Sequence, residues 1–262
     1  MNSLKTAAMI IAGGAICSFS VLADIQVETI SMDKAYNMGV TAFRPEAGFR
    51  YTFVNGASDI SDGSDYSAVQ SAFNTWIDEP SSALWAAENN YSGGSWGVYN
   101  GRNEISWISP TVSDANPWNN ILNLSQQVIA AVITVYNPLT KAILERDLFF
   151  NDVNMNWRTN TDGQQSSGFF VEHIALHEIG HIFGLKDMYN PGSPYWESWM
   201  GDDNEDLTMY GYSSRRDEDT TLSETDKYAM SLLHPAAVPE PSSISLLTAA
   251  IGFVIITRKP KR

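Results

Sequence analysis

The sequence is poor in two things, cysteine and positive charge. A single cysteine, Cys17, occurs among 262 residues, which excludes an internal disulfide and a zinc site built from cysteines. Lysine and arginine total 16 against 30 acidic residues, and the formal net charge is −14. A compact nucleic-acid-binding protein has the opposite balance, so we expect no nucleic-acid partner. With 44% hydrophobic and 18% charged residues, the chain has the composition of a globular protein and the length for a large domain.

The N-terminus has the pattern of a secretory signal. Lys5 precedes a run of small and apolar residues that extends from position 7 to position 22. The run ends in Val-Leu-Ala, where a signal peptidase could cleave after Ala23. We therefore expect residues 1–23 to be a signal peptide. A membrane anchor is the alternative, and the many glycines and alanines of the run disfavour it.

The C-terminus carries a second targeting pattern. Val238-Pro239-Glu240-Pro241 precedes an apolar stretch, and a basic cluster at 258–262 closes the chain. This arrangement resembles the PEP-CTERM sorting signal of Gram-negative bacteria. The resemblance implies that residues 238–262 are processed by an exosortase-type enzyme after transient membrane anchoring, and that the protein is exported to the cell surface or the extracellular matrix. An ordinary C-terminal membrane anchor is the alternative.

The region between these ends, residues 24–237, alternates strand and helix patterns. Period-2 and β-branched runs predict strands, and apolar residues at helical spacing predict helices. The run at 128–136 is typical of a strand buried on both faces. Ser223 is the expected N-cap of the last helix, with Asp226 as its capping-box partner. The order predicts one α/β domain without a linker. The expected strands are 49–54, 105–108, 128–136 and 148–151, and the expected helices are 66–78, 168–183 (the longest) and 224–233.

One segment, HEIGHIFGLKD, contains residues that can bind a metal. His177 and His181 are four apart, so on a helix they share a face and can bind one ion. Glu178 follows the first ligand and could accept a proton from a water molecule there. Gly184 can end the helix in a left-handed conformation, which allows Asp187 to return as a third ligand. Two imidazoles, one carboxylate and an open position make a catalytic zinc site.

This segment resembles the zinc signature of the metzincin peptidases, in which the third ligand is histidine or, in a minority, aspartate. The sequence LTMYGY at 207–212 resembles the Met-turn of that clan, with Met209 beneath the metal. Residues 222–233 resemble the closing helix of matrixin-like enzymes, and residues 148–152 resemble the edge strand before their active-site helix. The resemblance covers roughly residues 49–235.

The resemblance implies a fold and an activity. The fold is an α/β, metzincin-type twisted mixed sheet with a long active-site helix and a small C-terminal subdomain that ends in a helix. The activity is that of a secreted zinc metalloendopeptidase acting on protein or peptide substrates. Glu178 would be the general base and Met209 the support under the metal, and the zinc ligands would be His177, His181 and Asp187.

Other residues near the signature depart from the family pattern or have plainer interpretations. The chain has 4 histidines, too few for an additional structural zinc; His173 is expected at the rim, and His234 has no assigned role. Gly211 stands where some metzincins carry a tyrosine, with Tyr210 and Tyr212 beside it. Four loop acids could hold calcium, although they lack EF-hand spacing and a solvated loop is the plainer interpretation: Asp202, Asp203, Glu205 and Asp206.

Two alternative functions stay open at this point. One is a non-catalytic surface or biofilm-matrix protein on a peptidase scaffold, which the intact Glu178 argues against. The other is a zinc hydrolase that acts on something other than peptides. The plainest structural alternatives are a turn residue for Asp187 and core packing for Met209.

Overall fold

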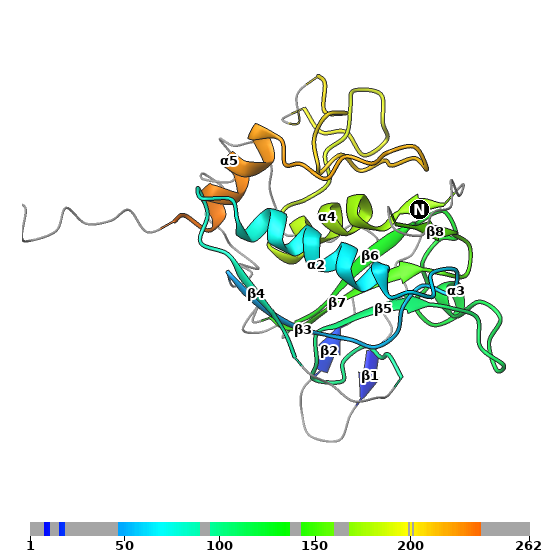
Figure 1. Ribbon diagram of the computed structural model, residues 1–262. Coiled ribbons are helices and arrows are strands. Elements are labelled where there is room, and N and C mark those ends of the chain that lie inside the picture. The colour runs from blue at the N-terminus through cyan, green and yellow to red at the C-terminus, as the bar shows by residue number, and fades with distance from the viewer. Residues whose placement is uncertain are drawn as a thin grey trace, which may run out of the picture.

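The computed structural model describes residues 47–89, 95–136, 143–159, 168–198, 200 and 202–236, with the backbone of two short strands near the N-terminus (Figure 1). These strands, β1 (Ala8–Ile10) and β2 (Ile16–Ser18), pair antiparallel within the expected signal peptide. The expected cleavage site at Ala23 and the sorting segment at 238–262 lie outside the described residues. No helix in the described part of the chain has the length and apolar character needed to cross a membrane.

A five-stranded mixed sheet forms the centre of the fold, in the order β4-β3-β5-β7-β6. Neighbouring strands are parallel except β6, which runs antiparallel to β7 at the edge of the sheet. This arrangement confirms the mixed α/β class. The strands are β3 (Gly48–Phe53), β4 (Trp85–Glu88), β5 (Glu104–Ile108), β6 (Ala130–Tyr136) and β7 (Ile143–Asn151).

Two helices, α2 (Ser64–Ile77) and α4 (Val171–Ile182), pack together over one face of the sheet (Figure 1). Trp76 of α2 is fully buried between them, and its indole N–H donates to the carbonyl oxygen of Leu176 at 2.8 Å. Below α2, the rings of Phe73 and Tyr51 stack at 4.6 Å. This aromatic face is core, as the helical spacing predicts.

The structure corrects two details of the sequence interpretation. Residues 148–152 do not form an edge strand, because β7 lies between β5 and β6, and the edge is β6. The segment that carries His177 and His181 is not the longest helix either, since α4 has 12 residues and α2 has 14. The helix begins only at Val171 because β9 (Phe169–Phe170) precedes it and pairs with β8 (Trp157–Arg158).

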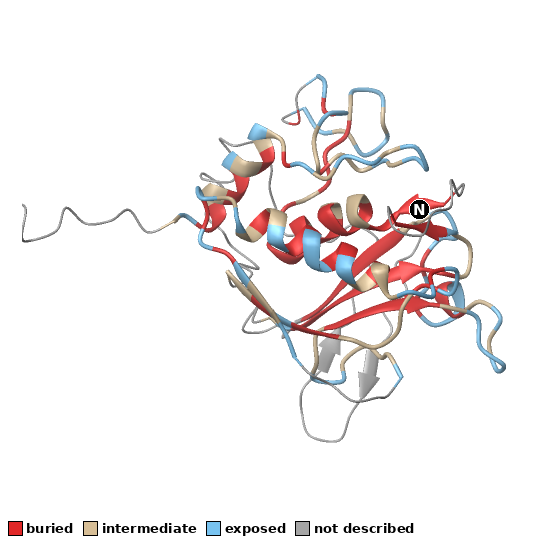
Figure 2. Ribbon diagram, in the orientation of Figure 1, coloured by how far each residue is buried: buried red, intermediate tan, exposed pale blue. Residues whose placement is uncertain are grey.

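The prediction that the run at 128–136 is buried on both faces is confirmed for residues 130–135, although β6 is an edge strand (Figure 2). Val128 and Ile129 are half-buried. The second face of β6 is covered by a short helix, α3 (Pro117–Asn120), and the chain that follows it. There Ala131 and Ile133 of β6 pack with Trp118 and Leu122 in a separate apolar cluster. Both faces of the sheet are therefore covered where β6 begins, next to α4.

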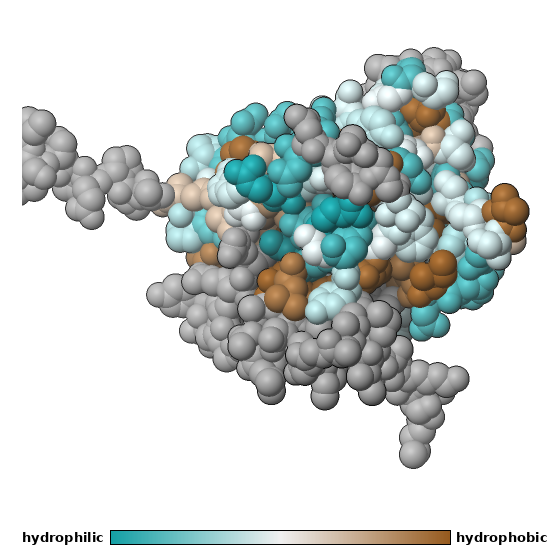
Figure 3. Space-filling model, turned by 90° about the horizontal axis from the view of Figure 1, so that it is seen from below, coloured by the Kyte–Doolittle hydropathy of each residue, from teal (hydrophilic) through white to brown (hydrophobic). Residues whose placement is uncertain are grey.

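The described chain after α4 is irregular until α5 (Glu224–Leu233), whose predicted bounds are confirmed. Figure 1 shows this segment on the side of α4 that faces away from the sheet. On the face seen in Figure 3, hydrophobic residues form separate areas with hydrophilic residues between them. Two of the exposed large apolar side chains, Tyr195 and Tyr212, come from the segment between α4 and α5.

Candidate metal centre

Helix α4 presents two imidazoles on one face, and the chain after it returns a carboxylate to them. The rings of His177 and His181 lie 4.8 Å apart, one turn from each other. The helix ends as expected, because Gly184 has a φ of 106°, which side chains rarely allow. Asp187 then places Oδ1 2.9 Å from Nε2 of His177 and 3.4 Å from Nε2 of His181.

Backbone carbonyl groups fix the orientation of both imidazoles. Nδ1 of His177 lies 2.8 Å from the carbonyl oxygen of Thr208, and Nδ1 of His181 lies 2.8 Å from that of Leu185. A carbonyl oxygen only accepts, so each Nδ1 carries the hydrogen and donates it. The Nε2 atoms are thereby left as ligands, with each ring held by its second nitrogen.

The positions of these donor atoms fit a divalent metal ion. Two ligands on a tetrahedral zinc ion with bonds of about 2.0–2.1 Å are roughly 3.3 Å apart. The distances from Asp187 to the two histidines bracket that value. The donor atoms of His177, Glu178 and His181 also lie within 4.8 Å of one another. The geometry supports a metal site and leaves the identity of the metal open.

The charge of Asp187 acts strongly on both histidines. Burial lowers the pKa of His181, but the charge and hydrogen bond of Asp187 outweigh it and raise the pKa to about 10. The pKa of His177 is raised as well, because the hydrogen bond and charge of Asp187 outweigh its burial. Positive charge is therefore favoured where the two Nε2 atoms meet. A divalent cation would compete with protons for this place.

Glu178 is buried beside this group with an unsatisfied oxygen. Its exposed fraction is 6%, and among the described residues Oε2 has no hydrogen-bond partner. Burial raises the pKa of the carboxyl group, and the neighbouring histidine charges oppose this only in part. A buried acceptor without a donor is costly unless a bound molecule supplies one. Glu178 is thus placed to receive a proton from a molecule in the adjoining cleft.

Met209 lies under α4, in the turn that also orients His177. Its side chain is fully buried, and a Cβ added to Gly180 would lie 2.3 Å from its sulfur atom. The N–H of Tyr210 closes the turn on the carbonyl oxygen of Leu207 at 3.0 Å. The N–H of Met188 donates to the carbonyl oxygen of Met209 at 2.7 Å, which joins the turn to the chain that follows Asp187.

The N-terminus of α5 holds the same turn in place. Ser223 is the N-cap, as predicted, and accepts from the N–H of Asp226 at 3.1 Å. In a capping box the side chain of Asp226 would accept from the backbone N–H of Ser223, but its partners here are different. Its Oδ2 accepts from the Ser223 hydroxyl at 2.6 Å and from the N–H of Thr208 at 2.7 Å. The peptide groups on both sides of Thr208 are therefore held, one by Asp226 and the other by His177.

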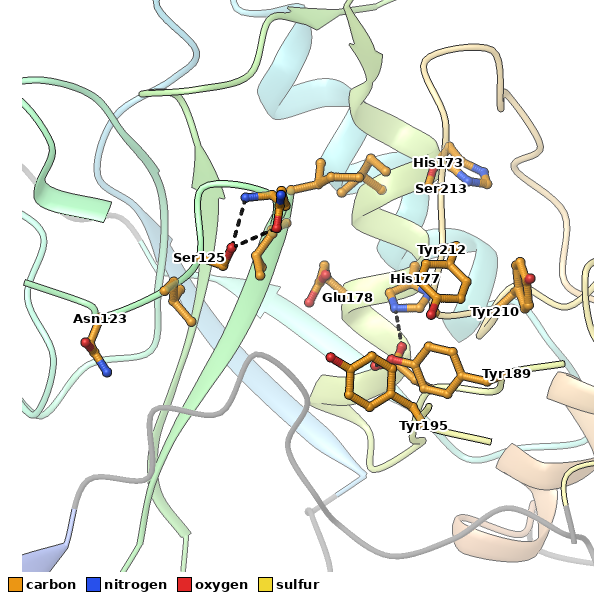
Figure 4. A pocket seen from close by; sticks show the side chains of 18 residues that line it. Asn123, Ser125, His173, His177, Glu178, Tyr189, Tyr195, Tyr210, Tyr212 and Ser213 are labelled. Atoms are coloured by element: carbon orange, nitrogen blue, oxygen red, sulfur yellow. Dashed lines mark hydrogen bonds and ion pairs between the residues drawn. The ribbon is translucent and has the colours of Figure 1, made fainter. Parts of the chain in front are cut away.

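A cleft of about 570 Å³ opens over the metal-binding residues. In Figure 4, Glu178 and His177 lie between the segment that carries Asn123 and Ser125 and a group of tyrosines. The cleft has the size of an ordinary ligand site. The tyrosines that line it are Tyr189, Tyr195, Tyr210 and Tyr212.

The remaining candidates lie outside the metal-binding group. Nδ1 of His173 is 2.7 Å from the carbonyl oxygen of Asp219, at the rim of the cleft as expected. His234 is buried, and its Nε2 lies 2.8 Å from the carbonyl oxygen of Phe183, just after α4. Among the described residues, only one group has metal-binding spacing, and it does not include the loop acids Asp202, Asp203, Glu205 and Asp206.

Sequence reasoning did not find several parts of the site. The carbonyl groups of Thr208 and Leu185 belong to residue types that give no signal for this role. The segment 123–130 forms a cleft wall only because β6 is the edge strand next to α4. Tyr189 could have been noticed, since it follows Asp187 by two positions.

No protein-family model matches the chain, and no curated protein matches it significantly.

Proposed function

We propose that the chain is a secreted, zinc-dependent metalloendopeptidase of metzincin type. The observation that carries the proposal is the unsatisfied Oε2 of Glu178, buried next to two imidazoles whose Nε2 atoms meet the carboxylate of Asp187. What distinguishes this unpaired acceptor is its place beside two imidazoles and a carboxylate, where it can accept a proton from a bound water molecule. The resemblance of the zinc signature and the Met-turn to metzincins supports the same reading.

In this proposal the chain's own groups divide the work. His177, His181 and Asp187 hold the zinc ion, which when bound polarises a carbonyl group and lowers the pKa of water. Oε2 of Glu178 accepts the proton of the attacking water and returns it to the nitrogen of the leaving amine. The burial that raises the pKa of Glu178 favours this exchange, because the carboxyl group holds the proton more readily between the two steps.

The same proposal gives the cleft and the chain ends their roles. Segment 123–130 forms one wall of the cleft and offers polar side chains to a peptide. The exposed Tyr195 and Tyr212 offer apolar surface on the other side. The patterns at 1–23 and 238–262 support export and transient anchoring, with an exosortase-type enzyme as processing partner. Secretion would bring the enzyme to protein substrates outside the cell.

The decisive test replaces Glu178→Gln, which keeps the shape of the side chain and removes the base. Zinc content should stay near that of the wild type, while hydrolysis of a peptide library should fall by about 10²–10⁴-fold. His181→Ala should lose both zinc and activity. Glu172→Gln is the matched control, because Glu172 is an acid in the first turn of the same helix and is not one of the proposed ligands. This variant should keep both zinc and activity.

Two results would contradict the proposal. One is a Glu178→Gln variant that binds zinc and hydrolyses peptides as fast as the wild type. The other is a zinc-loaded wild type that cleaves no peptide. That result would favour a non-catalytic scaffold or a hydrolase for another substrate.

A further inference from the structure

We infer that Tyr189 is a positioning residue for the third metal ligand, and that Gly211 makes room for it. The inference rests on the proposed function only in treating Asp187 as a ligand. The Tyr189 hydroxyl donates to Oδ2 of Asp187 at 3.2 Å, and both residues are 6% exposed. The other oxygen, Oδ1, faces the two histidines.

This hydrogen bond decides which carboxylate oxygen the metal meets. A carboxylate that is free to rotate can offer either oxygen or both to a cation. A donor fixed on Oδ2 leaves Oδ1 pointing at Nε2 of His177 and His181. The bond also withdraws some negative charge from the ligand, which influences how strongly the metal acts as a Lewis acid.

The ring of Tyr189 is held so that its hydroxyl has one direction. A Cβ added at Gly211 would lie 2.4 Å from the ring, so only glycine lets the ring occupy this place. The rings of Tyr195 and Tyr212 each lie 5.3 Å from it. The carbonyl oxygen of Tyr189 accepts from the side chain of Asn204 at 2.8 Å. Little conformational entropy remains to be lost when the hydroxyl meets Asp187.

With Tyr189, each of the three ligands has a second partner that orients it. The carbonyl groups of Thr208 and Leu185 serve His177 and His181. The Tyr189 hydroxyl does the same for the carboxylate. Removing one such partner typically lowers the affinity for the metal by about 10–100-fold.

The test compares Tyr189→Phe with wild type in metal binding rather than in catalysis. The variant keeps the ring on Gly211 and loses only the hydroxyl. Its zinc affinity, measured by competition with a chromophoric chelator, should fall by about 10–100-fold. The visible absorption spectrum of the cobalt(II)-substituted protein should also change, because the carboxylate can reorient at the metal.

The matched control is Tyr212→Phe, which removes a hydroxyl from the same group of rings. That hydroxyl lies 3.1 Å from Oγ of Ser193 and not at a metal ligand. Zinc affinity and the cobalt spectrum should stay as in wild type. A second variant, Gly211→Ala, keeps the Tyr189 hydroxyl but displaces the ring, and should lower zinc affinity as Tyr189→Phe does.

The outcomes separate this inference from the proposed function. If Tyr189→Phe binds zinc as tightly as wild type and gives the same cobalt spectrum, Tyr189 has no positioning role. If wild type binds zinc, the Tyr189 variant binds it more weakly and neither cleaves peptides, the positioning role holds and the peptidase proposal fails. A wild type that binds neither zinc nor cobalt would overturn both.

Discussion

Asp147 is a buried acid that lies outside the candidate metal centre. It lies in β7 with Glu145, next to Glu104 of β5, and the three side chains are at most 1% exposed. Oδ1 of Asp147 accepts from the N–H of Glu104 at 2.9 Å, while Oδ2 is buried with no hydrogen-bond partner among the described residues. Burial and the charge of Glu145 raise the pKa of Asp147 well above its usual range.

This raised pKa sets the sign of a stability change with pH. The folded state keeps the proton of Asp147 to a higher pH than the unfolded state does. The protonated Asp147 therefore costs the folded protein no stability below the unfolded pKa near 4. The free energy of unfolding then falls as pH rises from there through the folded pKa, because the carboxyl group must ionise while buried. Asp147→Asn should raise the free energy of unfolding at pH 8 by about 1 kcal/mol or more, and by much less at pH 4.

Urea unfolding of the metal-free protein at both pH values measures this difference. Asp202→Asn, in which an exposed acid is replaced, is the control and should change stability little at either pH. If Asp147→Asn instead destabilises the protein equally at pH 4 and pH 8, ionisation of the Asp147 carboxyl group does not destabilise the folded state.

At the scale of elements, α4 and the Met209 turn approach each other through Gly180. Alanine at this position would favour the helix by about 1 kcal/mol on propensity alone. However, its Cβ would lie 2.3 Å from the sulfur of Met209 and 3.2 Å from the ring of Trp76, and both side chains are fully buried. We expect the cost of overpacking to exceed the gain in helix propensity, so that Gly180→Ala lowers the free energy of unfolding by about 1–3 kcal/mol.

A double-mutant cycle with Met209→Ala checks the cause. When the methionine is shortened, Gly180→Ala should cost much less, giving a coupling of at least about 0.5 kcal/mol. Additive effects of the two changes would show that the contact does not limit how closely the turn approaches α4.

The elements and candidate ligands that follow local rules could be predicted from the sequence. His177 and His181 share a face because helix geometry places i and i+4 together, and Gly184 ends the helix because few other residues adopt its φ. Ser223 caps α5 for an equally local reason. Each of these depends on residues within a few positions of one another.

What could not be predicted depends on pairing across long sequence distances. The position of β7 inside the sheet results from pairing with both β5 and β6, whereas the edge position is expected only from the resemblance to matrixin-like enzymes. The Thr208 carbonyl meets His177 across 31 positions, and a carbonyl group is common to all residues. The place of Tyr189 depends on an empty space at Gly211, which no local pattern shows.

At the scale of the whole molecule, negative charge lies next to the cleft. A second hollow of about 530 Å³ shares His173, Tyr210 and Tyr212 with it. Acidic residues predominate among its charged groups, and Glu218 is paired with Arg158. With a net charge of −14, the protein should attract cationic molecules towards this side. The acids of the hollow are Glu205, Asp206, Asp217, Glu218 and Asp219.

If the chain is a peptidase, this field should appear in its kinetics. For two peptides that differ only in lysine against glutamate near the cleaved bond, the lysine peptide should have a kcat/KM about tenfold higher or more at low salt. The difference should shrink towards 0.5 M salt, where screening extends over only a few ångströms. A preference for glutamate, or one that does not respond to salt, would contradict the expectation.

The link from Asp226 through Thr208 to His177 also has a consequence for the order in which the chain is made. The ribosome delivers the polypeptide from its N-terminus, so α4 emerges with both histidines before Thr208, whose carbonyl group orients His177. Thr208 is not held until Asp226 has followed and α5 has formed. A chain that stalls before this point carries all three candidate metal ligands without a fixed His177, which delays a complete site until nearly the whole domain has left the ribosome.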